Sequence, residues 1–194
     1  MSALSEQVLR ELSPDAPLYF VLDGARDRSI RRWILGSGAP AWCLYAGALP
    51  AELEDAAPWL VRVLRGHAYA ERLFELGWSH HWGIALASQT PAKLLRRHLR
   101  RFLLAQTEDG RRMIFRYYDP RVLRAYLPTC NTEELTNFFG PISAIATNDS
   151  EPSSFNLFRR AGEAFEIRRI SIPAAAPAAT ALGAKETARV NPCS

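Results

Sequence analysis

The chain of 194 residues lacks the residue patterns from which most metal and disulfide sites are built. Its three cysteines, Cys43, Cys130 and Cys193, lie far apart and form no CxxC pair, which argues against a disulfide framework or a structural zinc site. None of the four histidines is spaced as HxxxH or HExxH, the patterns that place two ligands on one helical face. We therefore expect no metal site and no cofactor.

Long hydrophobic runs are also missing. No stretch of about 18 apolar residues could span a bilayer, and the first residues lack the basic segment and apolar core of a secretory signal. Hydrophobic residues make up 48% of the chain and charged residues 23%, which is typical of a globular protein. We expect a protein that works in the cytoplasm and does not insert into membranes.

The signatures of common enzymes are absent as well. The chain contains neither GxGxxG nor GxxxxGK[ST] nor GxSxG, so nothing indicates a dinucleotide site, a P-loop or a hydrolase nucleophile. Asp23 and Asp119 each follow an apolar segment and could meet at the sheet edge where α/β proteins bind ligands. However, Asp23-Gly24 also suits a turn, and Asp119 before Pro120 suits a helix N-cap. We expect that the protein is not an enzyme. The alternative is a small α/β enzyme with an acidic site at Asp23 and Asp119.

Short apolar segments alternate with helical patterns along the chain. Residues 18–22, 41–46, 59–64 and 82–88 are almost entirely apolar, which indicates strands that are buried on both faces. Because such strands are typical of parallel sheets, we predict an α/β fold with a mixed, largely parallel central sheet and helices packed on its faces. Residues 113–118 predict a further strand that leads directly into a helix capped by Asp119.

The length of 194 residues suits one domain with a sizeable core. We assign residues 1–172 to a single α/β domain. From Pro173 onward alanine, proline and threonine dominate, and this composition cannot supply a core. We therefore predict a flexible C-terminal tail over residues 173–194.

Positive charge is concentrated in the middle of the chain, where residues 61–127 hold 13 lysines and arginines against 5 acidic residues. Within this segment residues 91–104 predict an amphipathic helix, with Thr90 as its cap and His98 on the apolar side. Its polar side carries Arg96, Arg97, Arg100 and Arg101. Such a face can be solvated, or it can attract an acidic partner or nucleic acid. The aromatic residues that accompany basic ones in RNA-binding motifs are missing.

Several short motifs occur in a fixed order over residues 18–141. They are found at 19–25 (YFVLDGA), 43–47 (CLYAG), 57–61 (APWLV), 98–100 (HLR), 115–123 (FRYYDPRVL), 126–127 (YL) and 138–141 (FFGP). In this order they resemble the adaptor chaperones of bacterial type VI secretion, the Tap-like and VasW-like proteins that load toxic effectors onto a VgrG-type spike. The block at 115–123 is the strongest part of the resemblance.

The resemblance implies a non-catalytic cytoplasmic adaptor with two protein partners, a secreted toxin effector and a VgrG-type spike protein, and no nucleic acid. A basic nucleic-acid-binding domain is a further alternative. The resemblance names no contact residues, so we take the arginines of the predicted helix as the partner-binding candidates: Arg96, Arg97, Arg100 and Arg101. Asp23, Arg116, Asp119 and Pro120 are expected to be structural. Because an unpaired charge within an apolar strand is costly, we expect Asp23 and Arg116 to pair.

Overall fold

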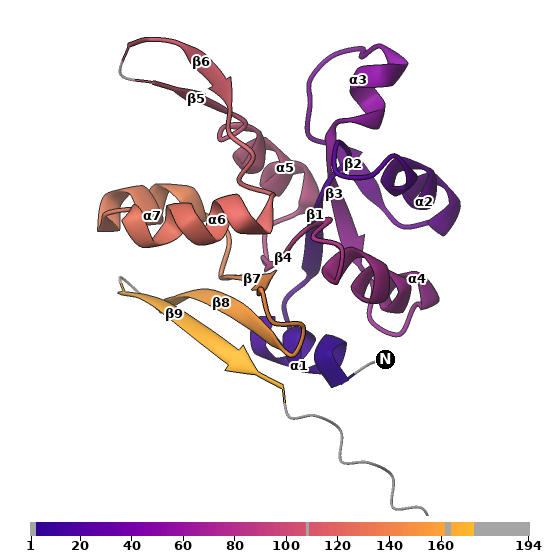
Figure 1. The fold of residues 1–194 in the computed structure, drawn as a ribbon, viewed down its shortest axis with the longest axis vertical. Coiled ribbons are helices and arrows are strands. Elements are labelled where there is room, and N and C mark those ends of the chain that lie inside the picture. The colour runs from indigo at the N-terminus through magenta and orange to yellow at the C-terminus, as the bar shows by residue number, and fades with distance from the viewer. Residues whose placement is uncertain (1–2, 108, 162–163, 173–194) are drawn as a thin grey trace, which may run out of the picture.

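The structure is a computed structural model, and it describes residues 3–107, 109–161 and 164–172. The predicted tail at 173–194 lies outside these residues. A seven-stranded sheet forms the centre, and a separate two-stranded hairpin extends from one side (Figure 1). Within the described residues no helix is both long and apolar enough to span a bilayer.

All neighbouring strands of the large sheet are antiparallel, in the order β2-β3-β1-β4-β7-β8-β9. The strands are β1 (Leu18–Asp23), β2 (Ala41–Cys43), β3 (Pro58–Val63), β4 (Gly83–Ala87), β7 (Ala144–Asn148), β8 (Ser154–Ala161) and β9 (Ala164–Ser171). The prediction of a largely parallel sheet is therefore wrong. The predicted strands at 18–22, 59–64 and 82–88 are confirmed, whereas the one at 41–46 ends at Cys43.

The prediction failed because we inferred parallel strands from apolar runs, which indicate only that a strand is buried. All six residues of β1 are buried, with Phe20 and Leu22 in one core and Tyr19 and Val21 in the other. Side chains alternate along a strand, so a continuous apolar run shows only that both faces are covered. Parallel sheets usually meet this condition, but an antiparallel sheet between two helical layers meets it equally well.

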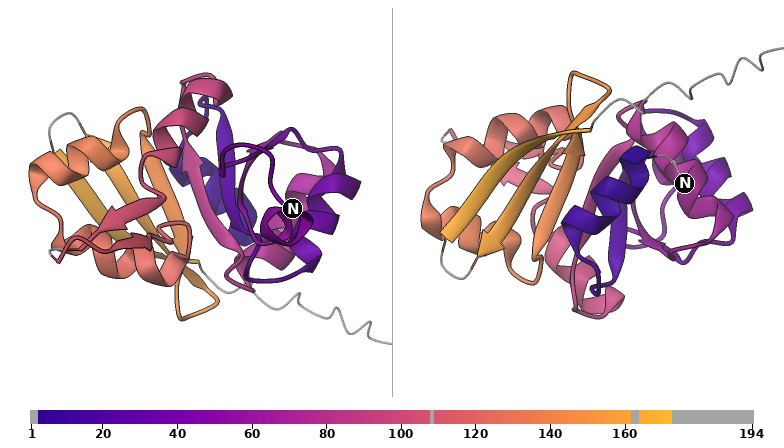
Figure 2. Two further views of the ribbon diagram at one scale, coloured as in Figure 1. Left: turned by 90° about the horizontal axis from the view of Figure 1, so that it is seen from above. Right: turned by 90° about the horizontal axis from the view of Figure 1, so that it is seen from below.

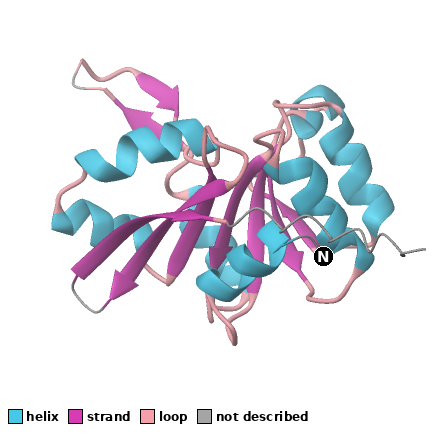
Figure 3. Ribbon diagram, turned by 60° about the horizontal axis from the view of Figure 1, so that its bottom comes forward, coloured by secondary structure: helices cyan, strands magenta, loops and turns pink. Residues whose placement is uncertain are grey.

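Helices cover both faces of the sheet, as predicted, and form two layers (Figure 3). One layer contains α1 (Ala3–Leu12), α2 (Ser29–Ser37), α4 (Ala68–Arg72) and the π-helical turn η1 (Leu73–Trp78). The other contains α5 (Ala92–Arg100), α6 (Pro120–Tyr126), the short η2 (Leu127–Thr129) and α7 (Thr132–Phe139). The remaining helix, α3 (Ala51–Asp55), buries no side chain. Figure 2 shows that α2 and α3 lie at the opposite end of the molecule from β8 and β9.

In the region of α5 and the chain that leads to α6, two elements of the structure differ from the prediction. The predicted helix at 91–104 ends at Arg100, and the chain then forms β5 (Leu104–Gln106), which pairs with β6 (Arg112–Ile114) in an antiparallel hairpin. The predicted strand at 113–118 is therefore short, and its second half is irregular. Thr90 does not cap α5, because Pro91 occupies the N-cap position without a side-chain hydrogen bond.

Candidate functional site

Residues 115–120 join the hairpin to α6 and connect three parts of the molecule. Arg116 donates a hydrogen bond to the carboxylate of Asp23 at the end of β1. The Tyr117 hydroxyl donates to the Leu99 carbonyl in the last turn of α5, at 3.0 Å. We call this segment, together with Asp23, the joint. Its backbone leaves the ladder of β6 after Ile114, and its side chains make these long-range contacts.

The expectations for the joint are met. Asp23 and Arg116 form a direct ion pair, although the sequence placed Arg116 in a strand. Asp119 is the N-cap of α6, where its carboxylate accepts a hydrogen bond from the Arg121 backbone N–H at 3.0 Å, and Pro120 occupies the first turn. These residues fix the direction in which α6 leaves the hairpin.

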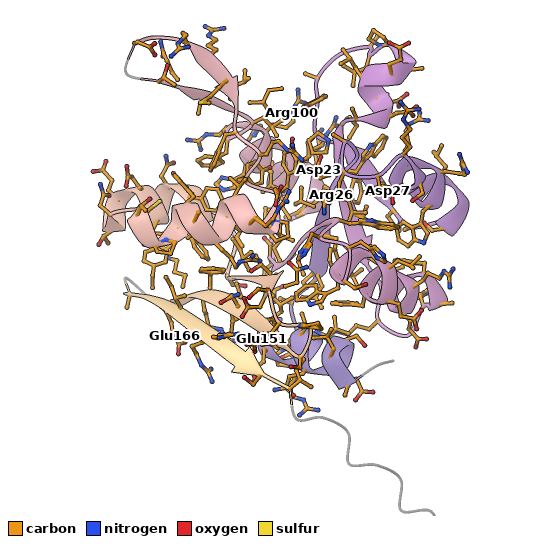
Figure 4. All side chains as sticks on the ribbon, viewed as in Figure 1. Asp23, Arg26, Asp27, Arg100, Glu151 and Glu166 are labelled. Atoms are coloured by element: carbon orange, nitrogen blue, oxygen red, sulfur yellow. The ribbon has the colours of Figure 1, made fainter. Side chains whose placement is uncertain are left out.

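The two carboxylates of the joint are buried but differ in their electrostatics. Asp23 is 1% exposed and lies between α6 and α2 in the view of Figure 4; burial raises the pKa of its carboxyl, and the hydrogen bond from Arg116 opposes this rise. Burial also acts to raise the pKa of Asp119, but hydrogen bonds from Arg121 outweigh it and hold that pKa below its ordinary value. Both groups are thus engaged by arginine. Among the described residues no three His, Cys, Asp or Glu side chains gather as a metal site.

The motif residues His98 and Gly140 meet where α5 crosses the end of α7. The Nε2 atom of His98 lies 2.8 Å from the Phe138 carbonyl oxygen, and the ring is half-buried against Phe102. Burial lowers the pKa of His98. Gly140 has a φ of +47°, and a Cβ atom there would collide with the His98 ring. His98 is therefore packed, as expected from its place on the apolar side of the helix.

Helix α5 carries positive charge that the fold does not neutralise. Leu95 and Leu99 are fully buried beneath it, and the sequence contains no acidic residue between Glu75 and Glu108. Within residues 3–107, 109–161 and 164–172, no carboxylate forms an ion pair with a basic residue of α5 or with Arg101. Some arginines of other elements are paired with carboxylates: Arg31 lies 2.6 Å from Glu54, for example. Lys93 and Arg97 of α5 are exposed, so this positive charge is accessible from solution.

The four arginines predicted to bind a partner do not form one patch. Arg96 donates through Nε to the Cys43 carbonyl of β2 at 2.7 Å, so part of this side chain is used within the fold. Arg101 points to the other side, where it reaches Asn137 of α7 at 3.3 Å. Arg97 and Arg100 make no such contact with the described residues, and they are the candidates that remain fully available.

A shallow basic hollow lies between α5 and the edge strand β2, with a volume of about 460 Å³. It is lined by Trp42, Lys93, Leu94, Arg96, Arg97 and Arg100. Trp42 is only partly buried, and the Leu94 side chain is 45% exposed. The hollow therefore combines positive charge with accessible apolar surface.

An apolar hollow of about 350 Å³ adjoins it, and Arg100 borders both. Its other lining residues are Leu44, Tyr45, Ala46, Leu49, Leu103, Leu104 and Ile114. Leu104 and Ile114 lie opposite each other in the hairpin and are 61% and 55% exposed. We call the two hollows together the α5 groove. In Figure 4, Arg100 lies near the base of the hairpin.

The apolar half of the groove was not predicted from the sequence. The predicted helix at 91–104 includes Leu104 and the predicted strand at 113–118 includes Ile114, and neither prediction places these two residues opposite each other in an exposed hairpin. The available signal was Glu108-Asp109-Gly110 between two short apolar segments, a pattern typical of a β-hairpin.

The family comparison covers this whole region. The family described as "Domain of unknown function (DUF4123)" matches residues 18–137. The chain belongs to this family. DUF4123 domains are associated with type VI secretion effectors, in agreement with the resemblance found in the motifs. The match includes the joint and the α5 groove, whereas β7, β8 and β9 lie beyond it. No curated protein and no solved structure matches the chain.

Proposed function

We propose that this protein is a non-catalytic cytoplasmic adaptor that binds a secreted toxin effector of type VI secretion and brings it to a VgrG-type spike protein. The DUF4123 match over residues 18–137 carries the proposal, because this family is associated with such effectors. The α5 groove is the surface that we assign to one of the two protein partners.

The surface chemistry of the groove supports a protein partner. Exposed apolar side chains that lie together are typical of protein-binding surfaces, and Leu94, Leu104 and Ile114 are each more than two-fifths exposed. The neighbouring cations would speed encounter with an acidic partner and make the complex sensitive to salt.

The joint supports a non-catalytic role. Asp23 and Asp119 were the candidates for acid or base chemistry, but the carboxylate of Asp23 is held by Arg116 and that of Asp119 by Arg121. The contacts of Arg116, Tyr117 and Asp119 connect β1, α5 and α6. This arrangement gives the residues of the joint a structural role, which supports the proposal.

The proposed function is tested by deleting the gene in a native cell with active type VI secretion. We expect export of one toxin to stop while the spike protein is still exported, and we expect that toxin and a VgrG-type spike to co-purify with the tagged protein after nuclease treatment. Unchanged export of every toxin would contradict the proposal. Co-purification that is lost with nuclease would instead favour the nucleic-acid alternative.

A further inference from the structure

The α5 groove has a defined polarity along its length. Lys93, Arg97 and Trp42 lie at one end, and the apolar hairpin residues Leu104 and Ile114 lie at the other. Between Lys93 and Arg100 helix α5 rises by about 10 Å, at 1.5 Å per residue, and the groove continues beyond its end to the hairpin. A partner helix of ten residues, about 15 Å long, would reach from Lys93 past the end of α5.

Strand addition does not suit this groove, even though β2 is an edge strand. The Pro40 carbonyl accepts from Arg62 and the Leu44 N–H donates to Pro58, so the backbone groups of both residues point towards β3. By alternation, those of Cys43 point outward. The Cys43 carbonyl already accepts a hydrogen bond from Arg96. Strand β2 has only three residues, and one of its outward carbonyls is already bonded to Arg96. It therefore offers few free backbone groups to a new strand.

The walls of the groove consist of side chains, which suits a helix. Leu104 and Ile114 project from directly opposite positions of the hairpin, and Tyr45 and Leu49 line the same hollow. Docking of an amphipathic helix relies on such apolar contacts at helical spacing. Carboxylates on that helix would meet Lys93, Arg97 and Arg100, which the described part of the chain leaves without acidic partners.

We propose that the α5 groove binds an amphipathic helix of the effector, with apolar side chains against the hairpin end and acidic side chains against the Lys93 and Arg97 end. This inference rests on the proposed adaptor function and specifies the chemistry of the segment that is recognised. The acidic side chains of this partner helix would face the basic side chains of α5.

Photo-crosslinking in the native cell tests the inference. A benzophenone amino acid is placed at Leu94 or at Ile114, one in each hollow, and at Leu35 of α2 as a control, which is 65% exposed and lies in the other helical layer. We expect Leu94 and Ile114 to crosslink to one short segment of a toxin, with Asp or Glu near the first crosslink and Leu, Ile, Val or Phe near the second. We expect no such product from Leu35.

The possible results separate the inference from the proposed function. A toxin that co-purifies but crosslinks from neither groove position overturns the inference and leaves the adaptor function intact. A crosslinked segment of the expected pattern in a protein that is not exported supports the groove and overturns the adaptor function. A crosslinked segment without acidic residues overturns the inference.

Binding of the crosslinked segment, synthesised as a labelled peptide, gives a quantitative check by fluorescence anisotropy. We expect Arg97→Glu with Arg100→Glu to raise the Kd at least tenfold, and Leu104→Asp with Ile114→Asp to do the same. The matched controls are Arg28→Glu with Arg32→Glu, which reverse two exposed arginines at the start of α2, and Leu35→Asp; they should change the Kd less than twofold. Equal effects of groove and control variants would overturn the proposal.

Discussion

The joint and the α5 groove use the same residue type in opposite ways. In the joint, Arg116 is paired with Asp23, and Asp119 is paired with the neighbouring Arg121; both carboxylates are almost fully buried. In the groove, Arg97 and Arg100 have no acidic partner among the described residues. A buried charge must be paired within the fold, whereas an exposed charge is solvated and remains available to bind another molecule. The joint should therefore determine stability and the groove should determine binding.

The largest effect on stability is expected for Arg116→Ala, which leaves the buried Asp23 carboxylate unpaired. Removal of one member of a buried ion pair costs about 3–5 kcal/mol, and because the Arg116 side chain is 42% exposed we expect about 2–4 kcal/mol in urea unfolding. Burial raises the pKa of Asp23, so the protonated carboxyl stabilises the fold below the ordinary aspartate pKa, and this stabilisation is lost as the pH rises through the raised value. In acid Asp23 is protonated in both proteins and no charge is left unpaired. The variant should therefore be closest to the wild type in acid.

Two variants sharpen this result. Arg112→Ala removes an exposed arginine of the hairpin and should cost less than about 0.5 kcal/mol. Asp23→Asn combined with Arg116→Ala removes the unpaired charge and should be more stable than Arg116→Ala alone at neutral pH. If all three variants were equally stable, the ion pair would have no structural importance.

The next effect is expected for Gly140→Ala, at the contact that holds α5 against α7. Gly140 has a positive φ, and a methyl group there would collide with His98, so we expect a loss of about 2–3 kcal/mol of unfolding free energy. Gly38→Ala is a control for a positive φ in the left-handed helical region, because Gly38 has open space around it; it should cost about 1 kcal/mol. In a His98→Ala background the loss caused by Gly140→Ala should shrink, and an unchanged loss would refute the steric explanation.

A smaller effect is expected for Asp119→Asn, which keeps a capping side chain but removes its charge. Hydrogen bonds from Arg121 hold the pKa of Asp119 below its ordinary value, so ionised Asp119 stabilises the fold above the ordinary aspartate pKa. This contribution is lost as the pH falls through the lowered pKa. We expect a difference of about 1 kcal/mol at pH 7 that vanishes in strong acid, measured by thermal unfolding across pH. A difference independent of pH would contradict this assignment.

The two regions also differ in how far the sequence could predict them. The pairing of Asp23 with Arg116 and the cap at Asp119 followed from local chemistry. A charge in an apolar segment needs an opposite charge, and Asp before Pro strongly favours the start of a helix. The antiparallel order of the sheet was missed, since the apolar run of β1 reports burial and carries no direction. The apolar half of the groove was missed because exposure of Leu104 and Ile114 depends on where a hairpin leaves the core, which is a tertiary property.

The smallest effect on stability, with the opposite sign, is expected for Arg97→Glu combined with Arg100→Glu. Lys93, Arg97 and Arg101 follow each other at intervals of four on α5 and its end, and like charges at this spacing destabilise a helix by a few tenths of a kcal/mol per pair. Reversal at Arg97 turns both repulsions into attractions, so the double variant should be as stable as the wild type or up to about 0.5 kcal/mol more stable at low salt.

Arg96→Glu is the informative control for this comparison because it lies on the same helix. Its Nε bonds the Cys43 carbonyl, so its loss should cost about 1 kcal/mol, although the change in charge is the same as at Arg97. Urea unfolding at low and high salt measures both variants, and the gain of the double variant should shrink as salt screens it. If the double variant were instead destabilised by as much as Arg96→Glu, the groove arginines would belong to the fold, and the contrast between joint and groove would fail.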